Sequence, residues 1–323
     1  MSDLEARPDE TLCQSSPAPG PRADIHPARE VPLGGVRGVT VLRALPQRDL
    51  PTVGAWCFLD HFGSTATDPR LPPDIDPHPH IGLQTVTWPF EGRIRHRDSI
   101  GSDVEIEPGQ LNLMTSGRGI AHSEYTVMGA PAGHGLQLWI ALPDADRWVA
   151  PHFEQHRELP ILESPGLRAT VLIGTLGSAV SPARTYSPLV GADLRIAAGA
   201  TVELPLNPDF EHALLVLDGR VTAAGTDVMP DTLLYLGSGR GELRLDGFDG
   251  AHAVLIGGLP FGEDLVMWWN FVARTHDEID AARRDWEDRA PQRFPTIPGH
   301  PPDQRIPAPP LPNLRLKPRH RRI

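Results

Sequence analysis

The tetrapeptide Ser-Gly-Arg-Gly occurs twice in this chain, at 116–119 and at 238–241, and each copy begins eight residues after a proline, Pro108 or Pro230. A second pair of landmarks precedes the two tetrapeptides in the same order, Glu91-Gly92-Arg93 in one half and Asp218-Gly219-Arg220 in the other. Recurrence of two landmarks in order indicates an internal duplication. The 323 residues are therefore predicted to hold two copies of one fold.

Each copy has the pattern of short strands separated by turns. The chain contains 36 Pro and 31 Gly, a composition that favours tight turns over long helices. Short strands at regular spacing predict an all-β protein made of two tandem β-sandwich or barrel domains. The predicted strands are Val39–Leu42, Ala55–Leu59, Leu83–Trp88, Glu91–His96, Leu111–Thr115 and Leu136–Leu142, then Ala169–Ile173, Asp193–Ala197, Thr201–Leu204, His212–Leu217, Thr232–Leu236 and Ala251–Ile256.

Composition also predicts how the chain is divided. Residues 1–30 are polar and predict a disordered leader, residues 31–145 the first domain, 146–167 an irregular linker, and 168–289 the second domain. A short helix is predicted at 275–289, with Thr275 as its N-cap and Glu278 completing a capping box. Trp268 and Trp269 are expected to pack this helix onto the second domain. Residues 290–323 predict an extended, Pro-rich, basic tail.

Charge and cysteine content limit the environment and partners. The net charge of -11 argues against direct binding of nucleic acid. Cys13 falls in the predicted leader, so a structural disulfide with Cys57 is not expected, which fits a reducing cytoplasm. The N-terminus shows no apolar signal sequence and no run approaches the length of a membrane span, so a cytoplasmic protein without membrane contact is expected.

Two pairs of potential metal ligands lie in the first copy, His78-Pro79-His80 and His122-Ser123-Glu124. Residues i and i+2 of a strand point to the same face, so each pair offers two ligands to one side of a sheet. Either pair alone is more often a solvated strand face. Together, in one small β domain, they predict a site for Fe, Mn, Ni, Cu or Zn, because imidazole and carboxylate suit these ions better than Mg or Ca.

The duplication gives an internal comparison for this site. The residues three and five positions after Gly119 are His122 and Glu124, whereas the matching positions after Gly241 are Arg244 and Asp246. The second half also contains nothing that resembles His78-Pro79-His80. The metal is therefore expected in the first domain alone, with the second copy keeping the scaffold.

Long, ordered segments of the chain resemble the pirin family of bicupins. They are Asp60–Gly63, the stretch from His78 to Gly92, Asp98-Ser99, the run from Pro108 to Glu124, Gly135–Trp139, Gly258–Gly262 and Asn270-Phe-Val272. The resemblance implies two tandem cupin β-sandwich barrels, a probable monomer, and one metal in the first barrel held by His78, His80, His122 and Glu124. The metal that the resemblance implies is Fe(II), with Mn, Ni, Cu, Co and Zn as alternatives. Gln84 and Ile81 depart from the commoner Glu and Arg of the family, which bears on the substrate pocket and leaves the ligand set intact.

The resemblance also implies two alternative functions. One is a flavonol 2,3-dioxygenase that opens a substrate such as quercetin with O2 and releases CO, with Glu124 either a ligand only or also the base that accepts the substrate proton. The other is a non-catalytic, redox-sensitive regulator that binds a transcription factor or a metabolic enzyme. The basic residues from Arg315 to Arg322 could attract an anionic partner, although such tails are more often only solvated.

Further residues are given structural interpretations. His61 and His96 are expected to line the pocket through hydrogen bonds and not as ligands. His134 is expected to lie in a turn or to contact a metal ligand without binding the metal itself. Gly117 and Gly119 are expected in a turn that requires positive φ.

Overall fold

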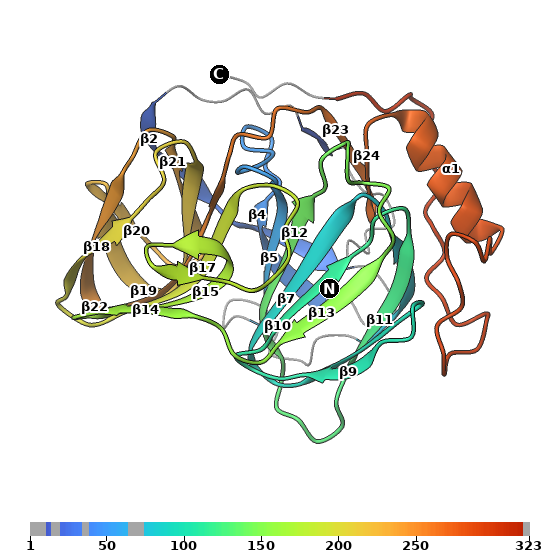
Figure 1. Ribbon diagram of the computed structural model, residues 1–323, viewed down its shortest axis with the longest axis horizontal. Helices are drawn as coiled ribbons and strands as arrows, with labels where there is room; N and C mark the ends of the chain where they lie inside the picture. The colour runs from blue at the N-terminus through green and yellow to red at the C-terminus, as the bar shows by residue number, and fades with distance from the viewer. Residues whose placement is uncertain (1–10, 14–19, 34–38, 64–73, 319–323) are drawn as a thin grey trace.

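The computed structural model describes residues 11–13, 20–33, 39–63 and 74–318 of the chain (Figure 1). It consists of two β-sandwich units side by side, with one helix at the outer end of the first unit. The prediction of an all-β chain with two tandem units and one short helix is confirmed, although the units are packed sheets and not closed barrels.

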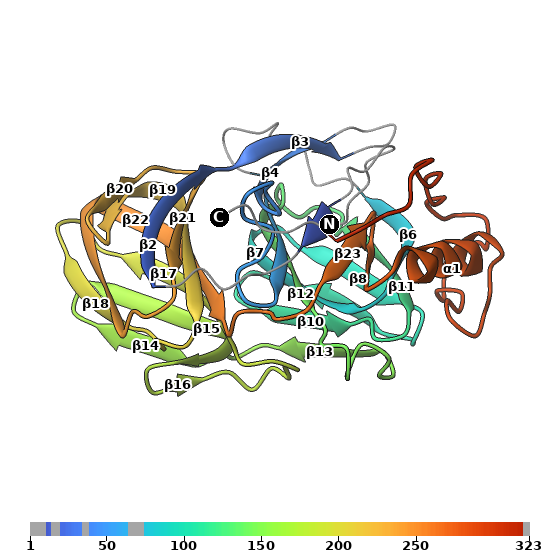
Figure 2. The same cartoon turned by 90° about the horizontal axis from the view of Figure 1, so that it is seen from above.

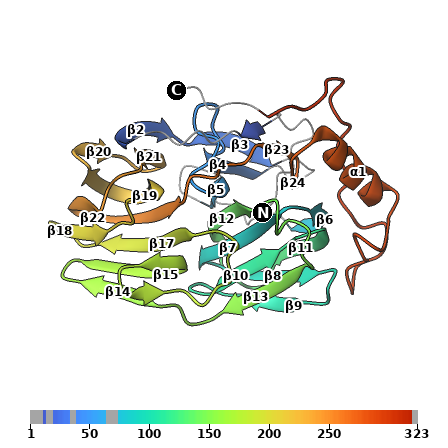
Figure 3. The same cartoon turned by 45° about the horizontal axis from the view of Figure 1, so that its top comes forward.

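The first unit is built from two facing sheets, visible as separate layers in Figure 3. The larger sheet contains, in spatial order, β13 (His152–His156), β10 (Leu111–Thr115), β7 (Leu83–Glu91), β12 (His134–Ala141), β5 (Trp56–Phe62), β4 (Val39–Leu45) and β3 (Arg29–Leu33). The smaller sheet contains β6 (Ile75–His80), β11 (Ile120–Thr126), β8 (Ile94–Asp98) and β9 (Asp103–Ile106).

The second unit is formed by a single 10-stranded sheet. Its main path is β14 (Ile161–Ser164), β15 (Leu167–Leu176), β17 (Leu189–Ile196), β22 (Glu242–Gly258), β19 (Glu211–Ala223), β21 (Thr232–Gly237) and β2 (Pro21–Pro27), with β16 (Ala179–Val180), β18 (Thr201–Pro205) and β20 (Thr226–Val228) paired at its sides. A separate small sheet joins β1 (Thr11–Cys13), β23 (Leu265–Trp268) and β24 (Phe271–Ala273).

A shared core joins the two units. One cluster of buried side chains includes Trp56, Leu138 and Trp139 of the first unit together with Leu215 and Val254 of the second. The indole Nε1 of Trp56 donates to carbonyls of the second unit, that of Gly257 at 3.1 Å among them. Because apolar burial is continuous across the boundary, the units are expected to unfold together.

The predicted leader and the predicted linker both contain strands that the sequence did not predict. Residues 21–27 of the predicted leader form β2, which pairs with β21 of the second unit, and β3 then crosses to the first unit (Figure 2). The predicted linker also contains strands, because β13 pairs with β10 in the first unit and β14 with β15 in the second. Residues 1–10 and 14–19 of the leader lie outside the described part.

Helix α1 (His276–Glu287) begins as predicted. Thr275 is the N-cap, and the reciprocal hydrogen bonds with Glu278 form the capping box. The helix packs with Trp268 and Trp269, as expected, but the same cluster contains Ile81 and Ala121 of the first unit. The prediction that the helix lies on the second unit is therefore wrong. The reason is that β23 and β24 carry the chain back to the first unit before the helix starts (Figure 1).

Several residues after α1 pack against the protein. Phe294 and Ile297 are buried in the same cluster as the helix, and the Ile306 N–H donates to the Pro77 carbonyl at 2.9 Å. The packing of Phe294, Ile297 and Ile306 differs from the prediction of an extended tail, while residues 319–323 lie outside the described part. Within the described residues, no helix has the length and apolarity needed to cross a membrane.

Candidate metal centre

The first ligand pair lies on β6, an edge strand of the smaller sheet of the first unit. Proline cannot donate a ladder hydrogen bond, so Pro77 and Pro79 are compatible with a strand only at such an edge. His78 and His80 alternate with these prolines and therefore share one face of the strand. Both imidazoles are fully buried, which excludes the interpretation of a solvated strand face.

The second pair lies on β11, between β6 and β8. His122 pairs directly with His78 on one side and with Asp98 on the other, and Glu124 pairs with His96. The register between β11 and β6 shifts between His122 and Glu124. Two neighbouring strands, β6 and β11, thus bring both predicted pairs to one patch of the sheet, and β8 adds His96 and Asp98.

The potential ligand atoms of these residues converge. Those of His78, His80 and His122 all lie within 4.8 Å of one another, and so do those of His96, His122 and Glu124. The Nε2 atoms of His80 and His122 are 3.1 Å apart. The structure therefore brings His78, His80 and His122 together in one group, and His122 together with Glu124 and His96 in a second.

The hydrogen bonds behind the rings show which nitrogen faces this centre. His78 Nδ1 lies 2.9 Å from the Asp76 carbonyl and His80 Nδ1 lies 3.2 Å from the Asn270 carbonyl. A carbonyl only accepts, so each Nδ1 must carry the proton and each Nε2 presents a lone pair. Asn270 lies in the turn between β23 and β24, and no sequence pattern connects it with His80.

Two successive hydrogen bonds, through His96 to Asp98, set the same tautomer in His122. Its Nδ1 lies 3.3 Å from Nδ1 of His96, whose Nε2 lies 3.2 Å from Oδ2 of Asp98. Because a carboxylate accepts, a neutral His96 donates from Nε2 and accepts at Nδ1 from His122, which places the lone pair of His122 on Nε2. The other oxygen, Oδ1 of Asp98, accepts from the amides of Ile100 and Ser102.

Burial keeps these imidazoles neutral. It lowers the pKa of His78 to about 4, opposed in part by the Asp76 carbonyl and the charge of Glu124. Burial, reinforced by the neighbouring His78, also lowers the pKa of His80 and of His122 well below the ordinary value of 6.5. Neutral imidazole is the form that binds metal, and the potential ligand atoms of these three buried imidazoles lie within 4.8 Å of one another. The donor set therefore fits a transition-metal ion.

Glu124 completes the set with an oxygen. Its side chain is buried, and its Oε1 lies 3.3 Å from the Thr87 hydroxyl, which also lies 3.2 Å from Oε1 of Gln137. The hydroxyl has one proton and can donate to only one of these acceptors at a time. Glu124 thus lies beside His96 and His122 and contacts Thr87 of β7, which in turn contacts Gln137 of β12.

The second unit has no comparable group. Within the described residues, only the two groups above combine three His, Cys, Asp or Glu at this spacing. Arg244 and Asp246, the counterparts from the repeat, pair with each other at 3.0 Å on the surface, while Leu243 and Leu245 fill the core. Relative to the repeat, the inward positions are displaced by one residue, which exchanges the two faces of a strand.

The remaining predicted residues have structural roles. Nε2 of His61 lies 2.8 Å from Nε2 of His134, and Nδ1 of His61 lies 3.0 Å from Asp231, a contact between the units and not part of the centre. Gln84 donates to Thr115 at 2.9 Å and to the Arg184 carbonyl at 3.0 Å.

Ile81 is buried in the cluster under α1, so it does not change the charge of a pocket rim. Gly117 and Gly119 have φ of 49° and 156°, which confirms the turn.

Two family models match this chain, Pirin over residues 38–140 and the Pirin C-terminal cupin domain over 191–294. A relative from Pseudomonas aeruginosa named "Putative quercetin 2,3-dioxygenase" is 44% identical and covers 88% of this chain and 89% of its own length. A pirin-like protein from Caulobacter vibrioides is 36% identical and covers 81% and 92%. The crystal structure of a quercetin 2,3-dioxygenase from Acinetobacter baumannii has a TM-score of 0.84 at 41% identity, covering 91% of this chain and 98% of its own.

Proposed function

Because this chain belongs to the pirin family, we propose that it is an oxygenase that uses one divalent metal, Fe(II) in first place, to open a flavonol such as quercetin with O2. We assign the metal to His78, His80, His122 and Glu124. The observation that carries the assignment is the convergence of three buried imidazoles whose potential ligand atoms lie within 4.8 Å of one another, each hydrogen-bonded at Nδ1. The similarity to proteins named quercetin 2,3-dioxygenase supports the reaction class.

The protein and the ion contribute different parts of this chemistry. An Fe(II) ion held by His78, His80, His122 and Glu124 would supply the redox chemistry that couples a flavonol to O2. The histidines orient the site, and their neutral state keeps its net charge positive when the ion is present. The Glu124 carboxylate is the nearest anionic oxygen and can accept the proton of the flavonol hydroxyl, while Thr87 stabilises whichever form is present.

The larger sheet supplies an aromatic wall for a flat substrate. The ring of Trp139 lies edge-on to His80, with 5.4 Å between ring centroids, and stacks on Phe58 at 4.1 Å. Trp139 shares a face of β12 with Gln137, which contacts Thr87 beside Glu124. The indole Nε1 of Trp139 is buried and has no hydrogen-bond partner among the described residues. An oxygen of the substrate would satisfy this donor.

The test is turnover by the iron-loaded protein. Quercetin in air should lose its flavonol absorbance and release CO in proportion, and both signals should disappear in metal-free protein and in His122→Ala. Absence of turnover with several flavonols, in protein that holds one metal per chain, would contradict the dioxygenase proposal.

That negative outcome would favour a second candidate, a non-catalytic, metal-dependent binding protein. One contact supports it, since Ser123, between two of the proposed ligands, lies 2.9 Å from Nε2 of His300 in the surface segment after α1. Ser123 and His300 therefore connect the metal centre to the surface, where a change in the charge of the metal would alter this contact. A His122→Ala variant that loses metal but keeps its partner would contradict this candidate.

A further inference from the structure

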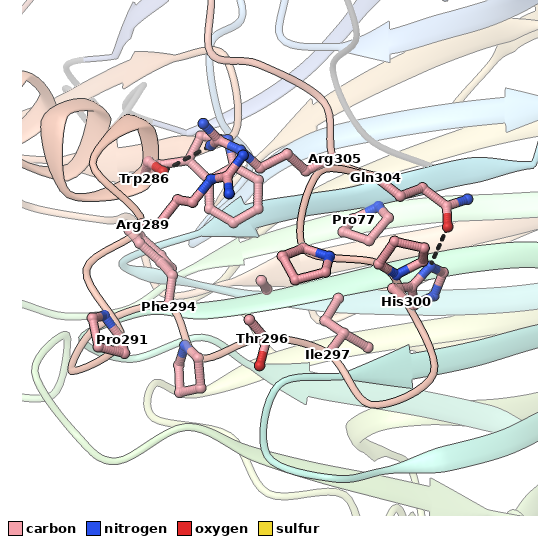
Figure 4. A pocket seen from close by; sticks show the side chains of 14 residues that line it. Pro77, Trp286, Arg289, Pro291, Phe294, Thr296, Ile297, His300, Gln304 and Arg305 are labelled. Carbon is pink, nitrogen blue, oxygen red and sulfur yellow. Dashed lines mark hydrogen bonds between the residues drawn. The ribbon is translucent and has the colours of Figure 1, made fainter.

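A pocket lies on the outer side of the strands that carry the proposed ligands (Figure 4). Its floor is Pro77 of β6 and Ala121 of β11, the residues that precede His78 and His122. Neighbouring residues of a strand face opposite sides, so the pocket and the metal centre lie back to back. Its other walls come from the end of α1 and from residues 291–305, and it encloses about 180 Å³.

The walls are held in place without a ligand. Nε2 of His300 is hydrogen-bonded to Ser123 at 2.9 Å, and Gln304 donates to the Tyr125 hydroxyl at 2.7 Å. The pocket residues from 295 onward follow the last residue matched by the family models, residue 294. The pocket is therefore a preformed feature built largely by the segment beyond the matched domains.

The charge of the lining favours an anion. Although the chain carries a net charge of -11, the lining contains two arginines, Arg289 and Arg305, and no carboxylate. Arg305 is engaged with the end of α1, donating to the Trp286 carbonyl at 2.7 Å (Figure 4). Arg289 follows the helix with φ of 56°, and no ion pair of its guanidinium occurs among the described residues. Its charge is therefore available to a ligand.

The rest of the lining favours a flat apolar body. Phe294, Trp286 and Ile297 line the pocket together with five prolines, Pro77, Pro291, Pro295, Pro301 and Pro302. Proline rings are rigid and apolar and carry no backbone N–H, so they pack well against an aromatic ring. Thr296, His300 and Gln304 supply a few polar atoms for a ring hydroxyl.

We propose that this pocket binds a small aromatic carboxylate, with the carboxylate at Arg289 and the ring against the prolines and Phe294. A guanidinium and a carboxylate form a charge-assisted, two-pronged hydrogen bond, which gives both affinity and orientation. The proposal does not depend on the proposed oxygenase activity, because the pocket lies outside the metal cavity.

The experiment is a titration of the full chain with benzoate, 4-hydroxybenzoate and the neutral analogue benzamide, followed by calorimetry and by NMR of the tryptophan side chains. Both acids should bind at least tenfold more tightly than benzamide. Arg289→Ala should weaken benzoate about tenfold and leave benzamide unchanged. Arg284→Ala is the matched control, since Arg284 lies on the exposed face of the same helix, paired with Asp280 at 3.0 Å, and should have no effect.

A second variant tests the location. Thr296→Trp replaces an exposed side chain of the lining with one that fills the pocket, and it should abolish binding without loss of stability. Binding should be the same in metal-free and metal-loaded protein. The proposal is overturned if the acids do not bind, if benzamide binds as tightly, if Arg289→Ala or Thr296→Trp has no effect, or if binding requires the metal.

Discussion

Nε2 of His80 lies 3.1 Å from Nε2 of His122, while Nδ1 of each ring is already hydrogen-bonded on the opposite side. The two Nε2 atoms face each other in a buried site, and a cation bound between them stabilises this arrangement. The partners at Nδ1 come from different parts of the chain, the Asn270 carbonyl for His80 and the His96–Asp98 pair for His122.

Asp98→Asn should weaken metal binding by about 10- to 100-fold. If the Asn oxygen continues to accept from Ile100 and Ser102, its NH2 group faces His96. His96 must then accept at Nε2 and donate from Nδ1, which forces a proton onto Nε2 of His122. Competition with a chelator measures the affinity. Asp103→Asn is the control, because Asp103 pairs with exposed Arg95 on the same hairpin, and equal affinities in the two variants would contradict the tautomer chain.

The metal-free protein should lose stability as the pH falls from about 6.5 to about 4. Burial lowers the pKa of His78 and of His212 to about 4, from 6.5. In this interval the unfolded chain binds protons that the folded chain does not, so each group costs up to about 3 kcal/mol, while above pH 6.5 both states are neutral and the cost disappears.

Denaturant unfolding across this pH range measures the effect. His212→Gln should flatten the dependence, and His156→Gln, at a partly exposed position on β13, should not. A free energy of unfolding that is constant between these pH values would contradict the buried, neutral state of the histidines.

Trp139→Phe should raise KM for a flavonol about three- to tenfold, with little change in metal content or kcat. The substitution removes the unpartnered N–H and keeps an aromatic ring against Phe58 and His80. Steady-state kinetics with metal analysis separates the two effects. Trp148→Phe, at a residue 51% exposed, serves as control. An unchanged KM would show that this indole does not contact the substrate.

Gly117→Ala should destabilise the protein by more than about 2 kcal/mol. Gly117 has φ of 49°, and an added Cβ would lie 2.0 Å from the Val149 carbonyl oxygen. Gly199→Ala isolates the conformational part of the cost, because Gly199 has φ of 69° and nothing within 4 Å of an added Cβ. Thermal unfolding should show a clearly larger loss of stability for Gly117→Ala than for Gly199→Ala. Equal losses of stability would mean that the Val149 carbonyl moves away from the added Cβ.

The sequence predicted what local patterns determine. The i, i+2 spacing placed His78 with His80 and His122 with Glu124, and the Thr275 capping box located the start of α1. His96 and Asp98 have the same spacing on β8, so their common face was also open to prediction. Asn270 was not, because a backbone carbonyl 190 residues from His80 leaves no mark on residue type.

The errors have physical causes as well. Residues 146–167 were predicted to be an irregular linker, but they contain β13, an edge strand that tolerates Pro151 and Pro160 beyond its ends. The tail has no helical or strand periodicity, so the burial of Phe294 and Ile297 could not be anticipated from pattern. The repeat located the second unit but misplaced its inward face by one residue, since Leu243 and not Arg244 faces the core.

The most direct test of the central claim is the metal content per chain of three proteins loaded with Fe(II) under anaerobic conditions and desalted. They are the unmodified chain, His122→Ala, and Arg244→Ala, which changes the repeat counterpart of His122 on the surface of the second unit. The geometry predicts one metal in the unmodified chain and in Arg244→Ala, and less than about a tenth in His122→Ala. A full equivalent of metal in His122→Ala, or a second equivalent in the unmodified chain, would contradict a single site built on the first unit.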